Sequence, residues 1–380
     1  MNHVIIQAHI FTGEQEYEDG FIRFNKKILA VGPMSEYNRK ASDQVVHDAK
    51  GSLVVPGFID VHSHGGYGID CMDGDPYKIN EMTQKMLSEG ITSYFPTTMT
   101  QSDARIEQAL IGIRKAKETN PMIQGIHLEG PFVSVDFKGA QPEEYIRVAD
   151  VEMMARWNAL SGRNIQLVTY APEIGQTSDF EAYCLENNIV LSAGHSGATY
   201  QELLRSKASH VTHLFNGQRG LHHREIGVAG YGLIKEEVYA EIIVDGLHVS
   251  PEMVKLAYKT KGASHLLLIT DSMRAKGLPN GESELGGQKV FVKDNEARLE
   301  NGALAGSVLK FNDAFKNTIE FTGCSIADAV QMSSVNQARE FDLVNKGLLS
   351  EGKDADFVIM DEEFEVLKTV LGGQMHGFRE

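Results

Sequence analysis

Two histidines, His62 and His64, stand two residues apart at the end of an apolar run. In a β-strand, residues i and i+2 point to the same face, so the two imidazoles would converge. Imidazole nitrogens and carboxylate oxygens bind divalent metals, and this ligand set suits Zn, Fe, Mn or Co. Taken alone, the pair is also consistent with two solvated or hydrogen-bonded histidines, so the prediction of a metal depends on what accompanies it.

Three further candidate ligands end or follow other apolar runs. Glu129 closes the run in MIQGIHLEGP, His195 lies in NIVLSAGHS, and His213 lies in SHVTHLFNG. A carboxylate beside such imidazoles can bridge two metals, so the set predicts a site for one or two divalent cations. Each residue also has a simpler interpretation, with Glu129 capping a helix and each histidine hydrogen-bonded in the core. His127 would lie one layer deeper, where a supporting role is favoured over ligation.

Acid/base chemistry is predicted for Asp271 and His248. Asp271 follows four apolar residues and a threonine in LLLITDS, and an uncompensated carboxylate is costly to bury there. A metal lowers the pKa of bound water from about 15.7 to about 7, and a neighbouring carboxylate can take its proton and deliver one to a leaving amine. His248 would donate to a substrate carbonyl oxygen as charge develops on it. The alternatives are a backbone cap for Asp271 and a plain loop histidine for His248.

A phosphate site is indicated by a basic cluster in a chain whose formal net charge is −16. Arg224 follows two histidines in GLHHREIG, and a guanidinium matches phosphate oxygens with two parallel hydrogen bonds. Solvated surface charge is the alternative. Backbone N–H groups at Asn216 and Gly217 could also bind an anion. A weaker signal is a small-residue stretch able to approach a ligand, at Leu304, Ala305 and Gly306.

These residues share one position if the chain forms a (β/α)8 barrel. Apolar runs suited to strands buried on both faces occupy residues 52–64, 91–98, 122–131, 164–173, 188–196, 209–217, 239–249 and 264–272, with helical segments between most of them. Eight strands with crossover helices predict a closed TIM barrel, whose chemistry lies at the carboxyl ends of its strands. Six of these runs place a potential ligand or acid/base group at that end.

The two ends of the chain have a different character. Short β-rich segments with turn glycines occupy the first residues, and ADFVIMDEEFEVLKTVLGG near the far end reads the same way. We therefore expect a small β-sandwich domain built from both termini, residues 1–52 plus 353–380, beside a metal-dependent hydrolase barrel at residues 53–352.

Composition and charge exclude several classes of protein. A surface this acidic argues against nucleic acid and anionic membranes as partners. Three cysteines form neither a disulfide framework nor a CxxC motif, and neither a signal peptide nor a run of roughly 18 apolar residues is present, so a cytoplasmic location is expected. No GxGxxG follows an early strand, so an open dinucleotide-binding sheet is set aside.

Eight strings along the chain resemble the N-acetylglucosamine-6-phosphate deacetylases, a family within the amidohydrolase superfamily. They are PGFIDVHSHG, HLEGPF, SAGHS, THLFNG, GLHHREIG, DGLHV, ITDS and LAGS, and they run in the family's order from residue 56 to residue 307. The His-x-His element alone marks only the superfamily. LEGPF together with THLFN, DGLHV and TDS is specific to the deacetylases.

The resemblance implies hydrolysis of the N-acetyl group of N-acetyl-D-glucosamine 6-phosphate to D-glucosamine 6-phosphate and acetate, by a metal-activated water with Asp271 as acid/base, in amino-sugar catabolism. It implies a homodimer in which Arg224 reaches the neighbouring subunit's site. The implied metal ligands are Glu129, His195 and His213, with His62 and His64 for a second metal. The implied substrate contacts are Ala140, Gln141, Asn216, Gly217, Arg224, His248, Leu304, Ala305 and Gly306.

Two departures from the family pattern are visible. Gly217 and Gln218 follow Asn216 where the family often reads THLFNAM, and Gln141 stands where some members have a histidine. Gln141 can form a hydrogen bond but cannot become charged. Alternatives remain open: another N-acyl amino sugar such as N-acetylgalactosamine 6-phosphate, a cyclic amide, or an inactive binding scaffold. A scaffold would be expected to have lost ligands or the acid/base carboxylate, and all are present here.

Overall fold

The computed structural model describes residues 2–378, and the chain divides into two compact units. One unit contains Val61–Thr83 and Tyr94–Lys310 and carries every predicted site residue. The other contains Met1–Asp60, Gln84–Ser93 and Phe311–Glu380. Within the described residues, no helix combines the length and the apolar character needed to cross a membrane.

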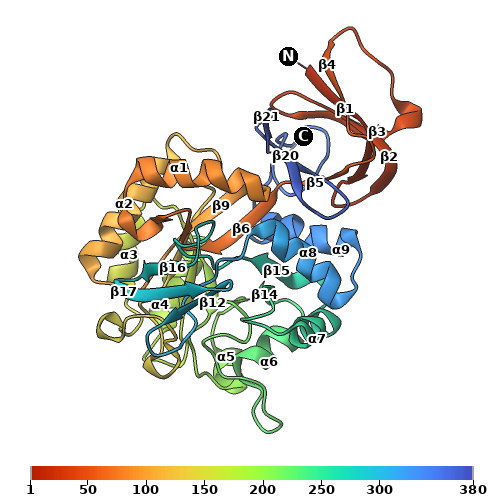
Figure 1. Ribbon diagram of the computed structural model, residues 1–380. Helices are drawn as coiled ribbons and strands as arrows, with labels where there is room; N and C mark the ends of the chain where they lie inside the picture. The colour runs from red at the N-terminus through yellow and green to blue at the C-terminus, as the bar shows by residue number, and fades with distance from the viewer. Residues whose placement is uncertain (1, 379–380) are drawn as a thin grey trace. The chain divides into compact units, whose positions relative to one another are not determined.

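Eight strands form one barrel sheet, in the order β15-β14-β13-β12-β11-β10-β9-β6 (Figure 1). They are β6 (Phe58–Ser63), β9 (Ile91–Thr98), β10 (Ile126–Glu129), β11 (Ile165–Tyr170), β12 (Val190–Ala193), β13 (His210–Val211), β14 (Tyr239–Ile243) and β15 (Leu266–Ile269). From β9 to β15 each neighbouring pair is parallel. The ring is joined where Asp271 N–H donates to the His62 carbonyl at 2.8 Å and His64 N–H to the Ser272 carbonyl at 2.9 Å. The predicted TIM barrel is confirmed.

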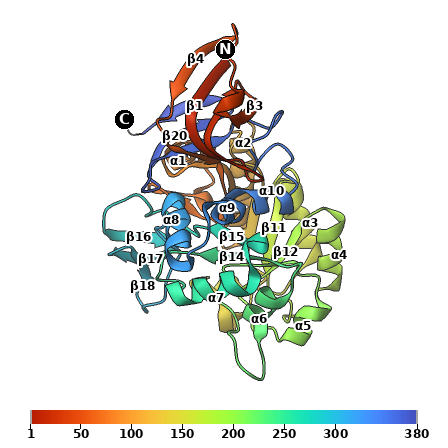
Figure 2. The same ribbon diagram turned by 90° about the vertical axis from the view of Figure 1, so that its right-hand side faces the viewer.

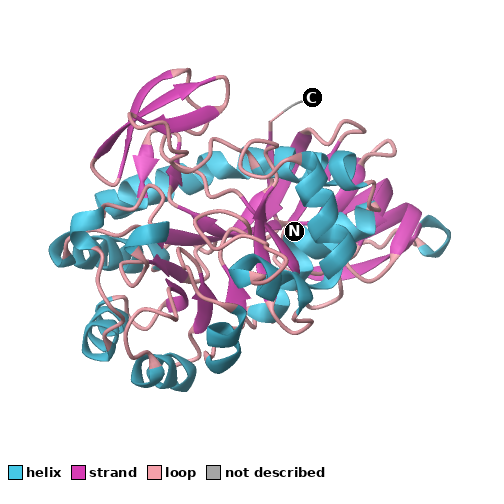
Figure 3. Ribbon diagram, turned by 90° about the horizontal axis from the view of Figure 1, so that it is seen from below, coloured by secondary structure: helices cyan, strands magenta, loops and turns pink. Residues whose placement is uncertain are grey.

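Helices alternate with these strands and lie outside them (Figures 2 and 3). They are α1 (Pro76–Met86), α2 (Asp103–Lys117), α3 (Val151–Leu160), α4 (Ser178–Glu186), α5 (Tyr200–Arg205), α6 (Gly227–Ile234) and α7 (Pro251–Lys261). In α2 the apolar residues Ile106, Ala109, Leu110 and Ile113, spaced to share one face of the helix, are buried. Helix α7 has Ser250 as N-cap and Pro251 at its first position, where the missing N–H would have no partner within the helix.

The second unit contains a sheet built from both ends of the chain. Its order is β21-β20-β19-β5-β1-β2-β3, and β4 also pairs with β1. The strands are β1 (Asn2–Phe11), β2 (Glu16–Phe24), β3 (Ile28–Pro33), β4 (Asp43–Asp48), β5 (Leu53–Pro56), β19 (Phe357–Met360), β20 (Val366–Leu371) and β21 (Gln374–Gly377). Apolar side chains from both ends form one core, among them Phe24 and Phe357, whose rings meet edge to face at 5.0 Å. A small β domain from both termini is confirmed.

The same unit holds the α-helices α8 (Phe311–Thr322), α9 (Ile326–Val330) and α10 (Asn336–Glu340). Phe311 and Phe315 of α8 are fully buried, and their rings lie 5.0 and 5.3 Å from the ring of Phe58. Aromatic contacts of this kind contribute about 0.5–1.5 kcal/mol each beyond the area they bury.

Two details of the strand assignment differ from expectation. The run at residues 52–64 is not one barrel strand, because β5 pairs with β1 and β19 in the terminal sheet and only β6 enters the barrel. A three-stranded antiparallel sheet, β16 (Gly281–Leu285), β17 (Gln288–Lys293) and β18 (Glu296–Leu299), was not predicted. The domain boundaries at residues 52 and 353 remain a prediction, and residues 1, 379 and 380 lie outside the described chain.

Candidate active site

Three predicted site residues lie two residues beyond the ends of β12, β13 and β15, where the backbone turns. His195, His213 and Asp271 adopt φ of 47°, 29° and 46°. Left-handed backbone is unfavourable for residues with a Cβ and costs on the order of 1–3 kcal/mol each. The surrounding barrel holds these side chains in place against that cost, which is typical of functional sites.

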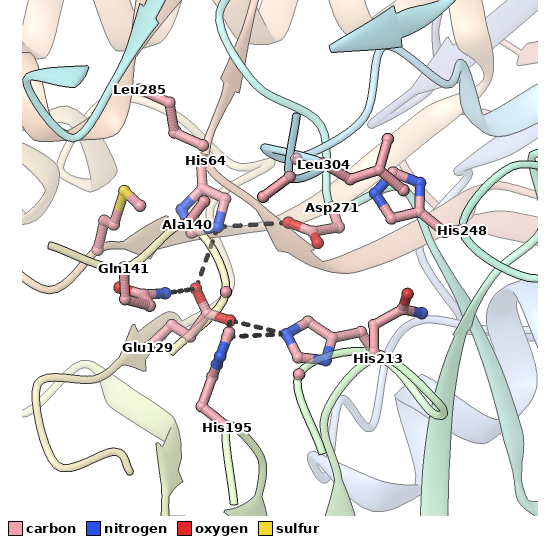
Figure 4. Close-up of a pocket in the computed structure, with 16 residues that line it drawn as sticks. His64, Glu129, Ala140, Gln141, His195, His213, His248, Asp271, Leu285 and Leu304 are labelled. Carbon is pink, nitrogen blue, oxygen red and sulfur yellow. Dashed lines mark hydrogen bonds and ion pairs between the residues drawn. The ribbon is translucent and has the colours of Figure 1, made fainter. Parts of the chain in front are cut away.

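Glu129, the last residue of β10, lies at the centre of the cluster (Figure 4). Its Oε1 lies 3.2 Å from Nε2 of His195 and 3.2 Å from Nε2 of His213. Its Oε2 lies 3.2 Å from Nε2 of His64. The two carboxylate oxygens therefore face different histidines, as a bridging carboxylate requires.

The contacts of Glu129, His195 and His213 are those of a metal site. His195 Nδ1 lies 2.9 Å from the carbonyl oxygen of Phe137, which can only accept, so this nitrogen carries a hydrogen. Nε2 of His195 faces Glu129 Oε1 at 3.2 Å and His213 Nε2 at 3.1 Å. Three ligand atoms rich in lone pairs and within 4.8 Å of one another fit a divalent metal.

A second group of ligand atoms lies on the other side of Glu129. Asp271 Oδ1 is 3.3 Å from Nε2 of His64 and 3.5 Å from Nε2 of His62. Nε2 of His62 is also 3.5 Å from Glu129 Oε1. All four side chains are buried. His62, His64 and Asp271 thus form a second group with the chemistry of a metal site.

Burial and charge shift the pKa values of this cluster. Burial alone would lower the pKa of His62, but the carboxylates of Glu241, Asp271 and Glu129 outweigh it and raise the pKa to about 9. Burial likewise opposes protonation of His64, and the contacts with Asp271 and Glu129 raise its pKa well above the ordinary value. Burial would raise the pKa of Glu129, but the neighbouring imidazoles, His62 foremost, hold it well below its usual range. A cation binding here must displace protons.

One charged residue in this region was missed by the sequence analysis. Glu241 lies in β14, is fully buried, and places Oε2 at 2.8 Å from Nδ1 of His62. The signal was present, because Glu241 interrupts the apolar run YAEIIV, and an uncompensated buried carboxylate is as costly there as at Asp271. His127, predicted to support the site from below, has Nε2 at 2.7 Å from Thr169 Oγ1 and its ring edge-on to His62.

A pocket opens above the cluster (Figure 4). Its lining contains most of the predicted metal, acid/base and substrate residues: His64, Glu129, Ala140, Gln141, His195, His213, Asn216, Gly217, His248, Asp271, Leu304 and Gly306. Met99, Gly139, Leu285 and Ala303 complete it and were not predicted. Leu285 comes from β16, so the unpredicted three-stranded sheet supplies part of the pocket wall.

Two polar side chains at the pocket are held by neighbours. His248 Nδ1 lies 2.6 Å from Asp245 Oδ2; burial would lower the pKa of His248, and this carboxylate raises it. Gln141 donates from Nε2 to Glu129 Oε2 at 2.8 Å, and its Oε1 accepts the N–H of Thr100 at 2.9 Å. Gln141 therefore orients the central carboxylate in this structure.

Two predicted substrate contacts do not line this pocket. Arg224 is exposed on a turn closed by His222 and Glu225, and its guanidinium lies 2.8 Å from Nε2 of His223. Ala305 is fully buried, with its N–H donating to the Ala297 carbonyl at 2.9 Å. His62 is also fully buried and lies beneath the lining rather than in it.

Comparisons with known proteins agree with this geometry. The model of the amidohydrolase family matches residues 53–375. An N-acetylglucosamine-6-phosphate deacetylase of Bacillus subtilis (strain 168) is 40% identical over 96% of this chain and 95% of its own length. An N-acetylgalactosamine-6-phosphate deacetylase of Escherichia coli O157:H7 is 32% identical over the full length of both chains.

A solved structure carries a ligand. It is a mutant of the N-acetyl-D-glucosamine-6-phosphate deacetylase of Mycobacterium smegmatis in complex with N-acetyl-D-glucosamine-6-phosphate, 27% identical, with a TM-score of 0.91 over 99% of this chain and 98% of that one. The chain therefore belongs to the amidohydrolase family, and its resemblance to the N-acetylglucosamine-6-phosphate deacetylases is confirmed over nearly its whole length.

Proposed function

We propose that this protein hydrolyses the N-acetyl amide of N-acetyl-D-glucosamine 6-phosphate to D-glucosamine 6-phosphate and acetate. The observation that carries the proposal is a carboxylate, Glu129, set between imidazoles on both sides, with Asp271 beside it at the base of a pocket. Two relatives with this activity in their names match 96% and 86% of the chain. The reaction belongs to amino-sugar catabolism, and we assign it to the cytoplasm.

Glu129, His195 and His213 would hold one divalent cation, and His62 and His64, beside Asp271, would hold a second. The metal is Zn, Fe, Mn or Co, with one or two per subunit, since these ligands suit all four. When bound, such a cation polarises the amide carbonyl and lowers the pKa of the attacking water.

The remaining chemistry belongs to side chains of this protein. Asp271 takes a proton from the attacking water and delivers one to the departing amine nitrogen, which is the role of a general base and then a general acid. His248 donates from Nε2 to the acetyl carbonyl oxygen as negative charge develops there. This requires the protonated ring: burial lowers the pKa of His248, but the Asp245 carboxylate at Nδ1 outweighs it and raises the pKa. Buried donors of this kind contribute about 3 kcal/mol to transition-state stabilisation.

The sugar phosphate is assigned to the rest of the pocket. The Asn216 N–H donates to the His213 carbonyl at 2.9 Å, so the Gly217 N–H is the backbone group that binds the phosphate from within the chain. Arg224, which lies outside this pocket, would reach the phosphate bound by the neighbouring subunit of a homodimer. The sugar contacts are Ala140, Gln141, His248, Leu304 and Gly306, which all line the pocket.

The test is acetate release by the purified, metal-loaded protein. We expect turnover of N-acetylglucosamine 6-phosphate to exceed that of unphosphorylated N-acetylglucosamine by at least about tenfold, because a charged hydrogen bond to phosphate contributes about 1.5–3 kcal/mol. Absence of acetate release from any N-acetyl amino sugar would refute the proposal.

The second candidate is the galacto epimer. A relative named N-acetylgalactosamine-6-phosphate deacetylase matches the full chain at 32% identity. The relative named N-acetylglucosamine-6-phosphate deacetylase is more similar, at 40% identity. Comparing kcat/KM for the two 6-phosphates decides between them. Faster turnover of N-acetylgalactosamine 6-phosphate would assign the chain to that substrate.

A further inference from the structure

The buried carboxylate of Glu241 lies below the pocket and has no place in the mechanism above. It is fully buried in β14, where an ionised carboxylate is costly unless several donors surround it. The donors come from other strands or their ends. Its Oε2 lies 2.8 Å from Nδ1 of His62 and accepts the N–H of His213 at 3.0 Å, and its Oε1 lies 3.1 Å from Nε2 of His210.

The contact between Glu241 and His62 decides which ring nitrogen can bind a metal. A carboxylate only accepts, so the Nδ1 of His62 carries a hydrogen. In a neutral imidazole this leaves the lone pair on Nε2, and that atom faces Glu129 Oε1 and Asp271 Oδ1 at 3.5 Å each. In the opposite tautomer, the lone pair of Nδ1 would face the Glu241 carboxylate. Nε2 would then carry the hydrogen and could not bind a metal.

We infer that Glu241 is a positioning residue that makes His62 a ligand and thereby creates the second cation position. The inference rests on the proposed function, since it assumes a two-cation site at Glu129. Carboxylates that accept from ligating imidazoles fix the tautomer and ring orientation and raise the basicity of the ligand, and their mutation costs about 10–100-fold in metal affinity. The contact with the His213 N–H holds the chain leaving β13 to the same carboxylate.

The experiment titrates metal-free, full-length protein with Zn²⁺ and reads the number of ions bound and their affinities. Three variants are compared with the wild type. Glu241→Gln keeps the size and one acceptor oxygen, Glu241→Leu removes both acceptors, and His210→Asn changes a partner of the other oxygen, Oε1, without touching a proposed ligand.

We expect the wild type to bind two Zn²⁺ ions per subunit. The weaker ion should bind about 10-fold less tightly to Glu241→Gln and about 100-fold less tightly to Glu241→Leu, so that the latter retains one ion at micromolar Zn²⁺. His210→Asn should remain within about threefold of the wild type, because it leaves His62 in contact with the carboxylate. Circular dichroism and thermal melts establish that each variant is folded.

Several outcomes would overturn the inference. They are a wild type that binds a single ion, Glu241 variants that bind both ions as the wild type does, or His210→Asn matching Glu241→Leu. If Glu241→Leu does not fold, the nitrogen chemical shifts of His62 are measured instead in the Zn²⁺-loaded wild type. A proton on Nε2 of His62 would contradict the inference. Acetate release by the wild type, measured alongside, separates failure of this inference from failure of the proposed function.

Discussion

Replacement of Asp271 by asparagine removes one charge and one proton-accepting oxygen while preserving shape. Asparagine is among the few residues that tolerate left-handed backbone, so the φ of 46° at this position is compatible with the change. The proposed first cation position, made by Glu129, His195 and His213, contains no atom of Asp271. We therefore expect Asp271→Asn to fold and to keep the metal bound there.

The magnitude follows from the role assigned to the carboxylate. General acid/base catalysis by a positioned side chain contributes about 10²- to 10⁴-fold in rate. At 1.36 kcal/mol per tenfold, this corresponds to about 3–5.5 kcal/mol of barrier. Because Asp271 Oδ1 also lies 3.3 Å from Nε2 of His64, we expect weaker binding of a second cation as well. The expected result is a fall in kcat of at least about 100-fold under saturating metal.

The assay combines steady-state acetate release with metal analysis of the same samples. Asp294→Asn is a matched control, since Asp294 also adopts left-handed backbone, with φ of 51°, but is exposed and does not line the pocket. It should retain wild-type kinetics. An Asp271→Asn enzyme that keeps its metal and works within about tenfold of the wild-type rate would refute the acid/base role.

Three further predictions concern other groups. Arg224→Ala should raise KM for the 6-phosphate substrate by about 10–100-fold, because a charged hydrogen bond is worth about 1.5–3 kcal/mol. The KM for the unphosphorylated sugar should change little. Equal effects on the two KM values would contradict a phosphate contact. His248→Asn should lower kcat by about 10²- to 10³-fold with metal content unchanged, as loss of an oxyanion donor does, and kinetics with metal analysis check this. In metal-free protein, the pKa of His62 is raised to about 9. Its protonation therefore contributes stability that is complete below the unfolded pKa of about 6.5 and is lost as pH rises through about 9. Urea unfolding of chelator-treated protein at pH 6 and pH 9.5 should show the lower stability at pH 9.5, and the opposite order would contradict the charge arrangement.

Most of the ligand set could be predicted from the sequence, because a barrel brings the carboxyl ends of all its strands close together in space. His62, Glu129, His195 and Asp271 are far apart in the chain, yet each stands at or just beyond the carboxyl end of a strand. Parallel strands in a closed sheet bring those ends to one rim. Periodicity and apolar runs therefore predicted the position of the site before any side-chain geometry was known.

Residues outside that rule were harder to predict. Leu285 reaches the pocket from a three-stranded sheet inserted after the last barrel strand, and an insertion obeys no barrel periodicity. Glu241 interrupts the apolar run YAEIIV without changing the strand prediction, and the sequence does not indicate which residues contact its carboxylate. Gln141 was noted as a departure, but its hydrogen bond to Glu129 depends on the path of the loop between β10 and α3.

The central claim is that imidazoles and carboxylates from separate strands hold a catalytic cation. Anomalous diffraction at the absorption edge of the metal, recorded from crystals of active protein, tests this most directly. We predict a peak within about 2.0–2.2 Å of a Glu129 oxygen and of Nε2 of His195 and His213. A peak elsewhere with none at these three side chains, or full acetate release from protein free of metal, would contradict the account.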